Sequence, residues 1–316
     1  MLNITTNPNS KSNLSVDGIY IDHPSLLNIR HWAKDLKLFS RQAARSMLLG
    51  ETRSRFRGRG MEFEEVRPYQ AGDDIRTIDW RVTARTGETY TKLFCEEHER
   101  PVHVIVDQRN ALFFGSQVQF KSVLAAKIST AIAWAALAGS DRIGGQIIGE
   151  YKNSDIRAKR NKQAVLKFIH DLTEFNFQLP VKHEEGIEAM SLGMTIKECR
   201  RITRPGTAIF IISDFHDFDD LAAQELSLLG RHSDISLVQV TDLLEENLPL
   251  TGNVAISNGA DRLSLQLNKQ TQASYLKKRQ TRDQEFKQAA IRARALYTKI
   301  NTDTPAQKAL QQIFKP

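Results

Sequence analysis

The stretch Val104-Ile-Val-Asp-Gln-Arg-Asn-Ala111 sets the pattern of the fold, because an apolar run ends there in a carboxylate and then in a turn-forming segment. The run begins at residue 102, and similar runs occupy residues 143–148, 207–212 and 235–240. Helical patterns separate or follow them, at residues 118–138, 159–174, 184–202 and 219–229. Strands that are apolar on both faces are typical of a sheet covered by helices on both sides. The sequence therefore predicts an α/β domain with a doubly wound, mostly parallel sheet.

The rest of the chain predicts three further regions around this α/β domain, which is placed at residues 101–245. Residues 1–17 are polar, lack periodicity and predict a flexible tail. Residues 18–100 predict one or two helices near 24–49 and then a small β-rich subdomain. Residues 246–316 predict a strand or hairpin at 254–267, a long basic helix at 273–300 and a short helix at 306–314, all packed on the α/β domain.

Composition favours a cytoplasmic protein without a membrane span. The chain has 316 residues, 41% of them hydrophobic, which is enough for a full core. Its most apolar segment, residues 124–138, contains Lys127 and falls short of the roughly 18 apolar residues that cross a bilayer. The first twenty residues lack the pattern of a signal peptide, and Cys95 and Cys199 lie far apart, which predicts packed thiols and no disulfide framework.

The net charge of +7 is concentrated in two segments. Residues 41–60 carry six arginines against Glu51, and residues 277–299 carry eight basic side chains against Asp283 and Glu285. Two interpretations remain open: solvated basic faces, or contacts with an acidic protein or a nucleic acid. Neither segment interleaves the aromatic residues that stack on bases, and no DNA-binding or RNA-binding signature accompanies them.

Two carboxylates follow apolar strands and should meet at one edge of the sheet. Asp107 ends the first strand, and Asp214 ends the fourth in Ile211-Ile-Ser-Asp-Phe-His-Asp217. Ligands of open α/β sheets bind beyond the carboxyl ends of the strands. The alternative is that both acids only accept backbone N–H groups of the turns that follow.

This arrangement resembles the von Willebrand factor A fold. In that family the first strand opens an Asp-x-Ser-x-Ser loop, which forms a metal-ion-dependent adhesion site with the Asp after the fourth strand. Here Arg109 and Ala111 stand where the two serines would be, so the resemblance implies a degenerate site without a metal. We expect Arg109 to pair with Asp107 or Asp214 and to replace the ion. No cofactor is expected.

The same corner provides candidate contacts for a partner and no recognisable catalytic set. The partner-binding candidates are Asp107, Arg109, Asp214, His216 and Asp217. A zinc or catalytic site would need a His-x-x-x-His, Cys-x-x-Cys or Ser-His combination, and none accompanies them in the sequence. The glycine pairs near residues 58–60 and 144–145 lack the Lys-Ser/Thr of a phosphate loop.

The most specific stretch of the sequence lies between residues 58 and 94. Twelve charged, aromatic and glycine residues in it form a recognisable signature: Gly60, Glu62, Phe63, Arg67, Tyr69, Gly72, Asp73, Asp74, Arg76, Asp79, Trp80 and Arg85. This pattern resembles the signature of the domain-of-unknown-function 58 family, in which it precedes a von Willebrand A-like domain. The opposite charges around its turns can form a structural clasp between a small and a large domain, or a docking surface for another protein.

The resemblance implies a non-enzymatic adaptor or co-chaperone that works with an AAA+ ATPase of the MoxR type in assembling or maturing protein complexes. The residues themselves indicate a chain without nucleotide-binding or catalytic motifs. The alternative function is a basic nucleic-acid-binding protein, and a metal-dependent hydrolase is the least favoured because it needs an intact metal site.

Overall fold

The computed structural model describes residues 18–36, 38, 61–96, 100–182, 186–246, 252–257 and 262–314. The chain forms two compact units, one made of residues 1–38 and 100–316 and the other of residues 39–99. The predicted tail, the six arginines of residues 41–60 and Gly60 lie outside the described residues.

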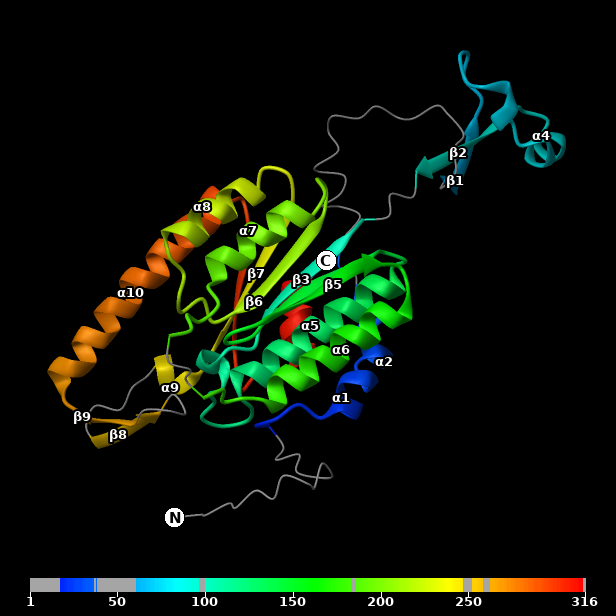
Figure 1. Cartoon of the computed structure of the whole chain (residues 1–316). Coiled ribbons are helices and arrows are strands. Elements are labelled where there is room, and N and C mark those ends of the chain that lie inside the picture. Colours follow the sequence, from blue (N-terminus) through cyan, green and yellow to red (C-terminus); the bar gives the residue numbers. More distant parts are fainter. Residues whose placement is uncertain are drawn as a thin grey trace. The chain divides into compact units, whose positions relative to one another are not determined.

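The larger unit contains a six-stranded sheet in the order β10-β7-β6-β3-β4-β5 (Figure 1). All neighbouring strands are parallel except β4 and β5, which are antiparallel. In chain order the strands are β3 (Val102–Asp107), β4 (Ile143–Ile148), β5 (Asn153–Lys159), β6 (Ala208–Ser213), β7 (Asp234–Thr241) and β10 (Leu296–Asn301). Three of them, β3, β4 and β6, are buried along their whole length, as their apolar runs predict.

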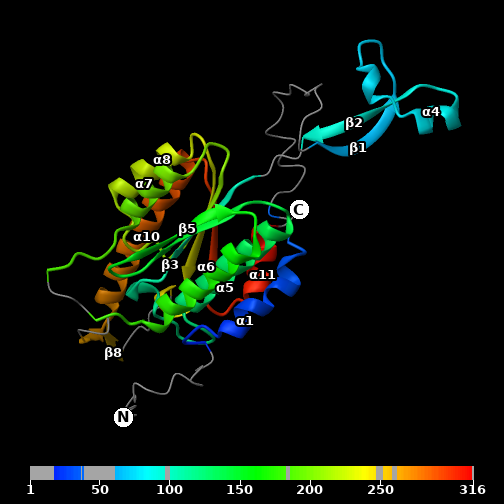
Figure 2. The ribbon, with the colours of Figure 1, turned by 45° about the vertical axis from the view of Figure 1, so that its right-hand side comes forward.

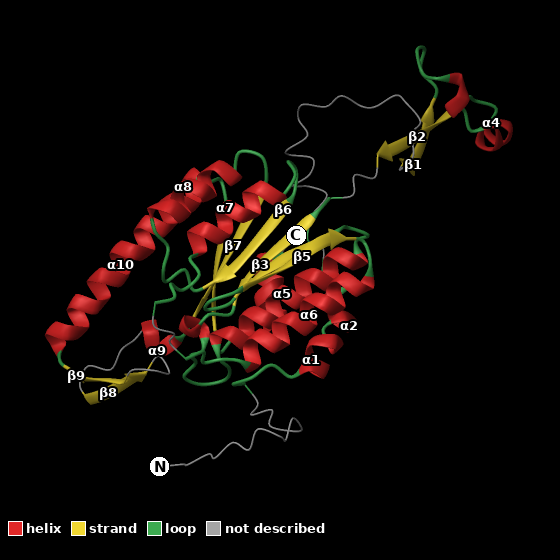
Figure 3. Ribbon diagram, in the orientation of Figure 1, coloured by secondary structure: helices red, strands yellow, loops and turns green. Residues whose placement is uncertain are grey.

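Helices cover both faces of this sheet, as Figures 1 and 2 show from two directions and Figure 3 shows by element type. One layer consists of α7 (Leu192–Ile202), α8 (Asp220–Leu229) and α10 (Lys269–Arg292). The other consists of α1 (His23–Asn28), α2 (Arg30–Ala33), α5 (Lys121–Ala138), α6 (Lys162–Phe177) and α11 (Ala306–Ile313). The predicted fold class, a doubly wound and mostly parallel sheet, is confirmed.

Helix α5 lies at the centre of the second layer. Fifteen of its eighteen residues are buried, between the sheet and helices α2, α6 and α11. By length and composition alone it is the one described helix that could cross a membrane, but 83% of that window is buried inside the molecule. The core helix of a folded domain passes the same test, so α5 serves here as core.

The structure corrects the predicted domain boundary near the N-terminus. The predicted region 18–100 groups the N-terminal helices with the small β-rich subdomain, whereas Met1–Leu38 belongs to the larger unit. The cause is the burial of Leu26, Ile29 and Ala33, which pack α1 and α2 against α5 and α6. A short amphipathic helix docks wherever its apolar face is covered, whatever its position in the sequence.

Two edge strands of the sheet were not predicted. Strand β5 has only one buried residue, Ile156, and β10 has only Ile300, so neither gives the long apolar run that marks the inner strands. Because β10 follows it, the expected helix at 273–300 ends at Arg292. The expected helix at 184–202 is also shorter than predicted and begins at Leu192. The predicted hairpin near 254–267 is present as β8 (Gly252–Ser257) and β9 (Arg262–Leu267).

The smaller unit is an antiparallel hairpin whose connection carries two short helices. Its elements are β1 (Met61–Pro68), the 3₁₀ helix η1 (Ile75–Thr77), α4 (Trp80–Thr86) and β2 (Tyr90–Glu96). Asp79 starts α4, because its carboxylate accepts the N–H groups of Arg81 and Val82. Gly87 ends it at a positive φ of 79°, which a residue without Cβ adopts at little cost.

Candidate functional site

Two polar side chains meet at the carboxyl edge of the sheet because β3 and β6 are parallel neighbours. Asp107 ends β3 and Ser213 ends β6, each directly after the paired residues Val106 and Ile212. Ser213 Oγ donates to Asp107 Oδ2 over 2.7 Å, and both residues are fully buried. A buried carboxylate is costly without a compensating charge, so Asp107 requires a cation beside it.

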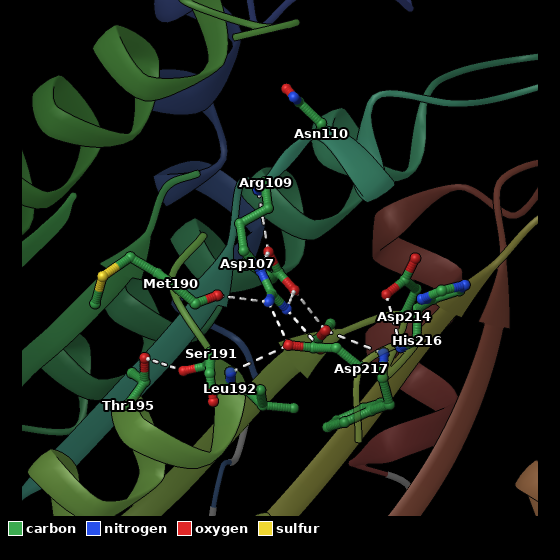
Figure 4. Close-up of polar contacts among 12 residues, drawn as sticks. Asp107, Arg109, Asn110, Met190, Ser191, Leu192, Thr195, Asp214, His216 and Asp217 are labelled. Atoms are coloured by element: carbon green, nitrogen blue, oxygen red, sulfur yellow. Dashed lines mark hydrogen bonds and ion pairs between the residues drawn. The ribbon is translucent and has the colours of Figure 1, made fainter. Parts of the chain in front are cut away.

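Arg109 supplies that cation. Its Nε and Nη2 donate to the two oxygens of Asp107 over 3.0 and 2.7 Å. Nη2 also donates to Asp217 Oδ1 over 2.8 Å, and Nη1 donates to Asp217 Oδ2 and, over 2.9 Å, to the carbonyl of Met190. All five guanidinium N–H groups therefore have an acceptor. Figure 4 shows the guanidinium lying between the two carboxylates.

The charges of Arg109 and Asp217 are fixed near neutral pH. Burial opposes a positive charge on Arg109, but the carboxylates of Asp107 and Asp217 outweigh it and raise the pKa of Arg109. Burial also opposes the negative charge of Asp217, but the hydrogen bonds and charge of Arg109 outweigh it and hold the pKa of Asp217 below its usual value. The N–H of Leu192, the first residue of α7, donates to Asp217 Oδ2 over 3.2 Å. The cluster is thus one cation between two anions.

A second buried cation, Lys121 at the start of α5, holds two further acids of this edge. Its Nζ donates to Asp214 Oδ2 over 2.8 Å and to Glu245 Oε1 over 2.7 Å, and it lies 5.8 Å from the ring centroid of Phe114. Burial opposes both charges, yet the pairing raises the pKa of Lys121 and lowers the pKa of Asp214. Lys121 is only 2% exposed, so its charge depends on these partners.

The predicted pairing of Arg109 is confirmed for Asp107, and its second carboxylate is Asp217 where the sequence offered Asp214. The reason is a sharp turn after β6. Phe215 has a positive φ of 54°, and its N–H donates to Ser213 Oγ over 3.0 Å. This turn directs Asp214 to Lys121 and Asp217 to Arg109, and in Figure 4 Asp214 lies apart from the guanidinium, beside His216.

The backbone at Phe215 is strained, and packing holds it in place. A non-glycine residue in the left-handed region costs on the order of 1–3 kcal/mol. Phe215 is 2% exposed, and its ring centroid lies 4.4 Å from that of Phe286 on α10 and 6.4 Å from that of Phe218. The core between the sheet and α10 therefore fixes the turn that separates the two acidic clusters.

Lys121 and Glu245 were missed by the sequence reasoning. The available signal was a single lysine at the start of an otherwise apolar helix segment, Phe120-Lys-Ser-Val-Leu124. A charged residue on the buried face of a helix needs a partner, but the sequence does not indicate which distant carboxylate provides it.

Only some of the predicted partner-binding residues are exposed enough for a partner protein to contact them. Asp107 is fully buried and Arg109 is 7% exposed, so neither can contact a partner without a rearrangement. The Asp217 side chain is 35% exposed, and His216 is exposed. Ala111, where a second serine would stand, is exposed in the 3₁₀ helix η2 (Asn110–Leu112).

Away from this corner, one group of two carboxylates and an imidazole among the described residues could hold a metal ion. His170, Asp171 and Glu174 lie on α6 with ligand atoms within 4.8 Å of one another. Asp171 already accepts from Ser154 over 2.6 Å and from Lys167 over 2.8 Å. This group is a partly exposed, internally bonded helix face and not a built site.

The predicted thiol environment is confirmed for Cys199, which is fully buried. Burial raises the pKa of its thiol to about 12, which makes it unreactive near neutral pH. The side chain of Cys95 lies outside the described part of β2.

Within the smaller unit, the acidic residues of the signature stretch organise the local backbone. Asp73 pairs with Arg67 over 2.8 Å, and its backbone carbonyl accepts from the Tyr69 hydroxyl over 3.3 Å. Gly72 precedes it at a φ of 106°. Asp74 accepts the Arg76 N–H over 3.0 Å. This arginine pair lies inside the smaller unit, so the predicted clasp between a small and a large domain stays a prediction.

Other signature side chains are exposed or fall outside the description. Arg76, Trp80 and Arg85 are exposed. Glu62 and Phe63 lie on β1, but their side chains are not among those described.

The basic C-terminal segment is partly neutralised within the chain. Arg279 lies 3.7 Å from Glu246 and 3.9 Å from Asp283, and Lys299 pairs with Glu246 over 2.5 Å. Several of its charges therefore act within the fold, and the rest lie on α10 and the turn that follows.

Comparison with known proteins identifies a family. The profile of DUF58, described as a protein of unknown function, matches residues 65–292. Uncharacterized protein Rv1480 of Mycobacterium tuberculosis and uncharacterized protein Mb1516 of Mycobacterium bovis are each 27% identical over 238 residues, covering 75% of this chain and 72% of theirs. The predicted resemblance to the domain-of-unknown-function 58 family is confirmed.

Two solved structures give distant matches. The conserved hypothetical protein BatB of Bacteroides thetaiotaomicron has 14% sequence identity and a TM-score of 0.41, covering 67% of this chain and 96% of that one. The VWA domain of SpRpn10 has 12% identity and a TM-score of 0.33, covering 67% of this chain and 93% of that one.

Proposed function

This chain belongs to the DUF58 family, and from that premise we propose that it is a non-enzymatic adaptor or co-chaperone for protein complexes. It works in the cytoplasm with an AAA+ ATPase of the MoxR type. The ATPase supplies the work of remodelling, and this chain contacts the client protein.

The observation that carries the proposal is the saturated guanidinium of Arg109. Magnesium requires near-octahedral oxygen ligands, and the carboxylates of Asp107 and Asp217 are both bonded to Arg109. A guanidinium about 5 Å from a divalent ion would repel it by roughly 7 kcal/mol at an effective dielectric of 20. The corner is therefore interpreted as a degenerate adhesion site that acts through protein contacts and not through a bound ion.

The titratable side chains in the core also favour contact over catalysis. Burial lowers the pKa of His103 to about 4 and raises that of Cys199 to about 12. At neutral pH the His103 imidazole is therefore neutral and too weak a base for general acid–base catalysis, and the Cys199 thiol is protonated and a poor nucleophile. His216 is exposed, with its backbone N–H on Asp214, whose carboxylate is already paired with Lys121.

Affinity purification of the chain from its native cell, with and without ATP, tests the proposal. We expect an AAA+ ATPase to be recovered with it, in an amount that depends on nucleotide. Recovery of no such ATPase under either condition would contradict the adaptor function.

A pair of histidine variants tests whether the corner takes part. His216→Ala alters an exposed side chain beside Asp214, and we expect it to reduce recovery of the partner. His232→Ala is the matched control, because His232 is equally exposed but lies just before β7, at the other edge of the sheet. Equal recovery with both variants would remove the corner from the interface.

Calorimetric titration with magnesium or manganese tests the interpretation of Arg109. We expect no saturable binding. Tight binding that disappears in Asp107→Ala would show that an ion displaces the guanidinium.

A further inference from the structure

The segment between the two strands of the smaller unit presents large apolar side chains to solvent. Trp80, the first residue of α4, is 67% exposed, and Ile75 in η1 is 66% exposed. Single exposed apolar residues are common on protein surfaces. Two of this size, five residues apart and interleaved with arginines, are the composition found in protein interfaces.

The charges of the same segment are unevenly paired. Asp79 caps α4 and lies 3.4 Å from Lys92, and Asp73 pairs with Arg67, while Asp74 caps η1. The three exposed arginines of the segment have no ion-pair partner among the described residues: Arg76, Arg81 and Arg85. The acids thus hold the backbone, and no carboxylate of the described residues pairs with the three arginines.

The backbone that carries these side chains is fixed in advance. Thr77 Oγ1 lies 2.7 Å from Thr91 Oγ1, and Ile78 forms a bridge with Thr91 on β2. The Tyr90 N–H donates to Thr83 Oγ1 over 3.0 Å, which fastens α4 to the same strand. A surface that is already ordered loses little conformational entropy on binding.

We propose that Ile75, Arg76, Trp80, Arg81 and Arg85 form a docking surface for an acidic segment of a partner protein. The arginines pair with its carboxylates, and an apolar side chain of the segment packs on Trp80 and Ile75. A nucleic acid fits less well, since single-strand binding sites use several stacking aromatics and Trp80 is the one strongly exposed aromatic of the described part of this unit. The proposal rests on the adaptor function and locates a contact on the other unit.

Fluorescence anisotropy with a labelled synthetic peptide of glutamate and leucine tests this surface. The reference probe has glutamine in place of glutamate. We expect the full chain to bind the acidic peptide more tightly than the reference, with an affinity that falls as salt increases. The triple variant Arg76→Glu/Arg81→Glu/Arg85→Glu should weaken binding by at least about tenfold, and Trp80→Ala by about tenfold.

A triple variant on the larger unit controls for net charge. Arg157→Glu/Lys162→Glu/Arg201→Glu changes three exposed basic residues that have no ion-pair partner in the described chain, and it should retain binding within about twofold. Equal loss in both triple variants, or no preference of the wild-type chain for the acidic peptide, would overturn the proposal.

Two further measurements separate the alternatives. Tighter binding of a single-stranded oligonucleotide, lost in the Arg76 triple variant, would assign the surface to nucleic acid. A lower melting temperature for Trp80→Ala or the Arg76 triple variant would show that the surface is a clasp within the chain. Recovery of the ATPase without peptide binding would contradict this docking surface and leave the adaptor function. Peptide binding without recovery of an ATPase would support the docking surface and contradict the adaptor function.

Discussion

Arg109 and Lys121 are both buried cations at the carboxyl edge of the sheet, and each lies between two carboxylates. They differ in how completely they are bonded. Arg109 uses all five donors, and its partner Asp107 is fully buried. Lys121 has three donors, and its partner Glu245 has a side chain that is 28% exposed. Each cation nevertheless pairs with one buried acid and one partly exposed acid, since the side chains of Asp217 and Glu245 are 35% and 28% exposed. The difference between the clusters is therefore the number and direction of the donors: the planar fork of arginine holds both acids through five directed bonds, and lysine holds them through a point charge with three donors.

The largest expected effect is that of removing the arginine. Arg109→Met leaves Asp107 buried without a countercharge and should destabilise the chain by about 4–5 kcal/mol. Arg109→Lys keeps the charge but offers three donors in place of five, and should cost less. Denaturant unfolding at pH 7 measures both. Equal loss for Met and Lys would show that geometry, and not charge, holds the corner together.

Removing the lysine should have a smaller effect. Lys121→Met should cost about 3 kcal/mol, because Glu245 can turn to solvent while Asp214 stays largely buried. Asp214→Asn removes the charge that Lys121 balances, so Lys121→Met/Asp214→Asn should be more stable than Lys121→Met alone. A double-mutant cycle measures this coupling. Strict additivity would contradict the pairing.

The sequence predicted the inner part of the fold well because the inner strands carry their own signal. Strands β3 and β6 read as continuous apolar runs, and Asp107 at the end of β3 and Asp214 directly after β6 identified the correct edge of the sheet. Strands β5 and β10 were missed because an edge strand buries too little of its length to produce such a run.

The site was predicted in part. The pairing of Arg109 with Asp107 could be inferred because the two residues are close in sequence, with no long-range information. The choice between Asp214 and Asp217 depends on the left-handed turn at Phe215, which is fixed by packing against Phe286, seventy-one residues further along the chain. No local pattern encodes that contact.

The pH dependence of stability should distinguish the contribution of the buried His103 from that of the two acidic clusters. Burial lowers the pKa of His103 to about 4, against about 6.5 in an unfolded chain. The unfolded state therefore takes up a proton first, so stability is complete above about pH 6.5 and falls by at most about 3 kcal/mol towards pH 4. Asp214 and Asp217 have lowered pKa values, so their contribution persists above about pH 4 and is lost only below it.

The free energy of unfolding measured from pH 7.5 to 4.5 tests this assignment. This range of about three pH units covers the His103 transition and stays above the transitions of the carboxylates. His103→Gln preserves a polar side chain near Gln146, which lies 3.4 Å from the imidazole, and should flatten the profile. If the slope is unchanged in this variant, the acid sensitivity belongs to another group.

The smallest effect concerns a hydroxyl that only the Arg109 cluster possesses. Ser213 Oγ donates to Asp107 and accepts the N–H of Phe215, so Ser213→Ala leaves a buried carboxylate oxygen and a buried amide each with one bond fewer. We expect a loss of about 1–2 kcal/mol. Ser122→Ala is the matched control, because Ser122 is equally buried, next to Lys121, and its hydroxyl has no hydrogen-bond partner in the described chain. That variant should be neutral or slightly stabilising in the same unfolding measurement, and a similar loss in both would mean that the Ser213 hydroxyl adds nothing specific to the arginine cluster.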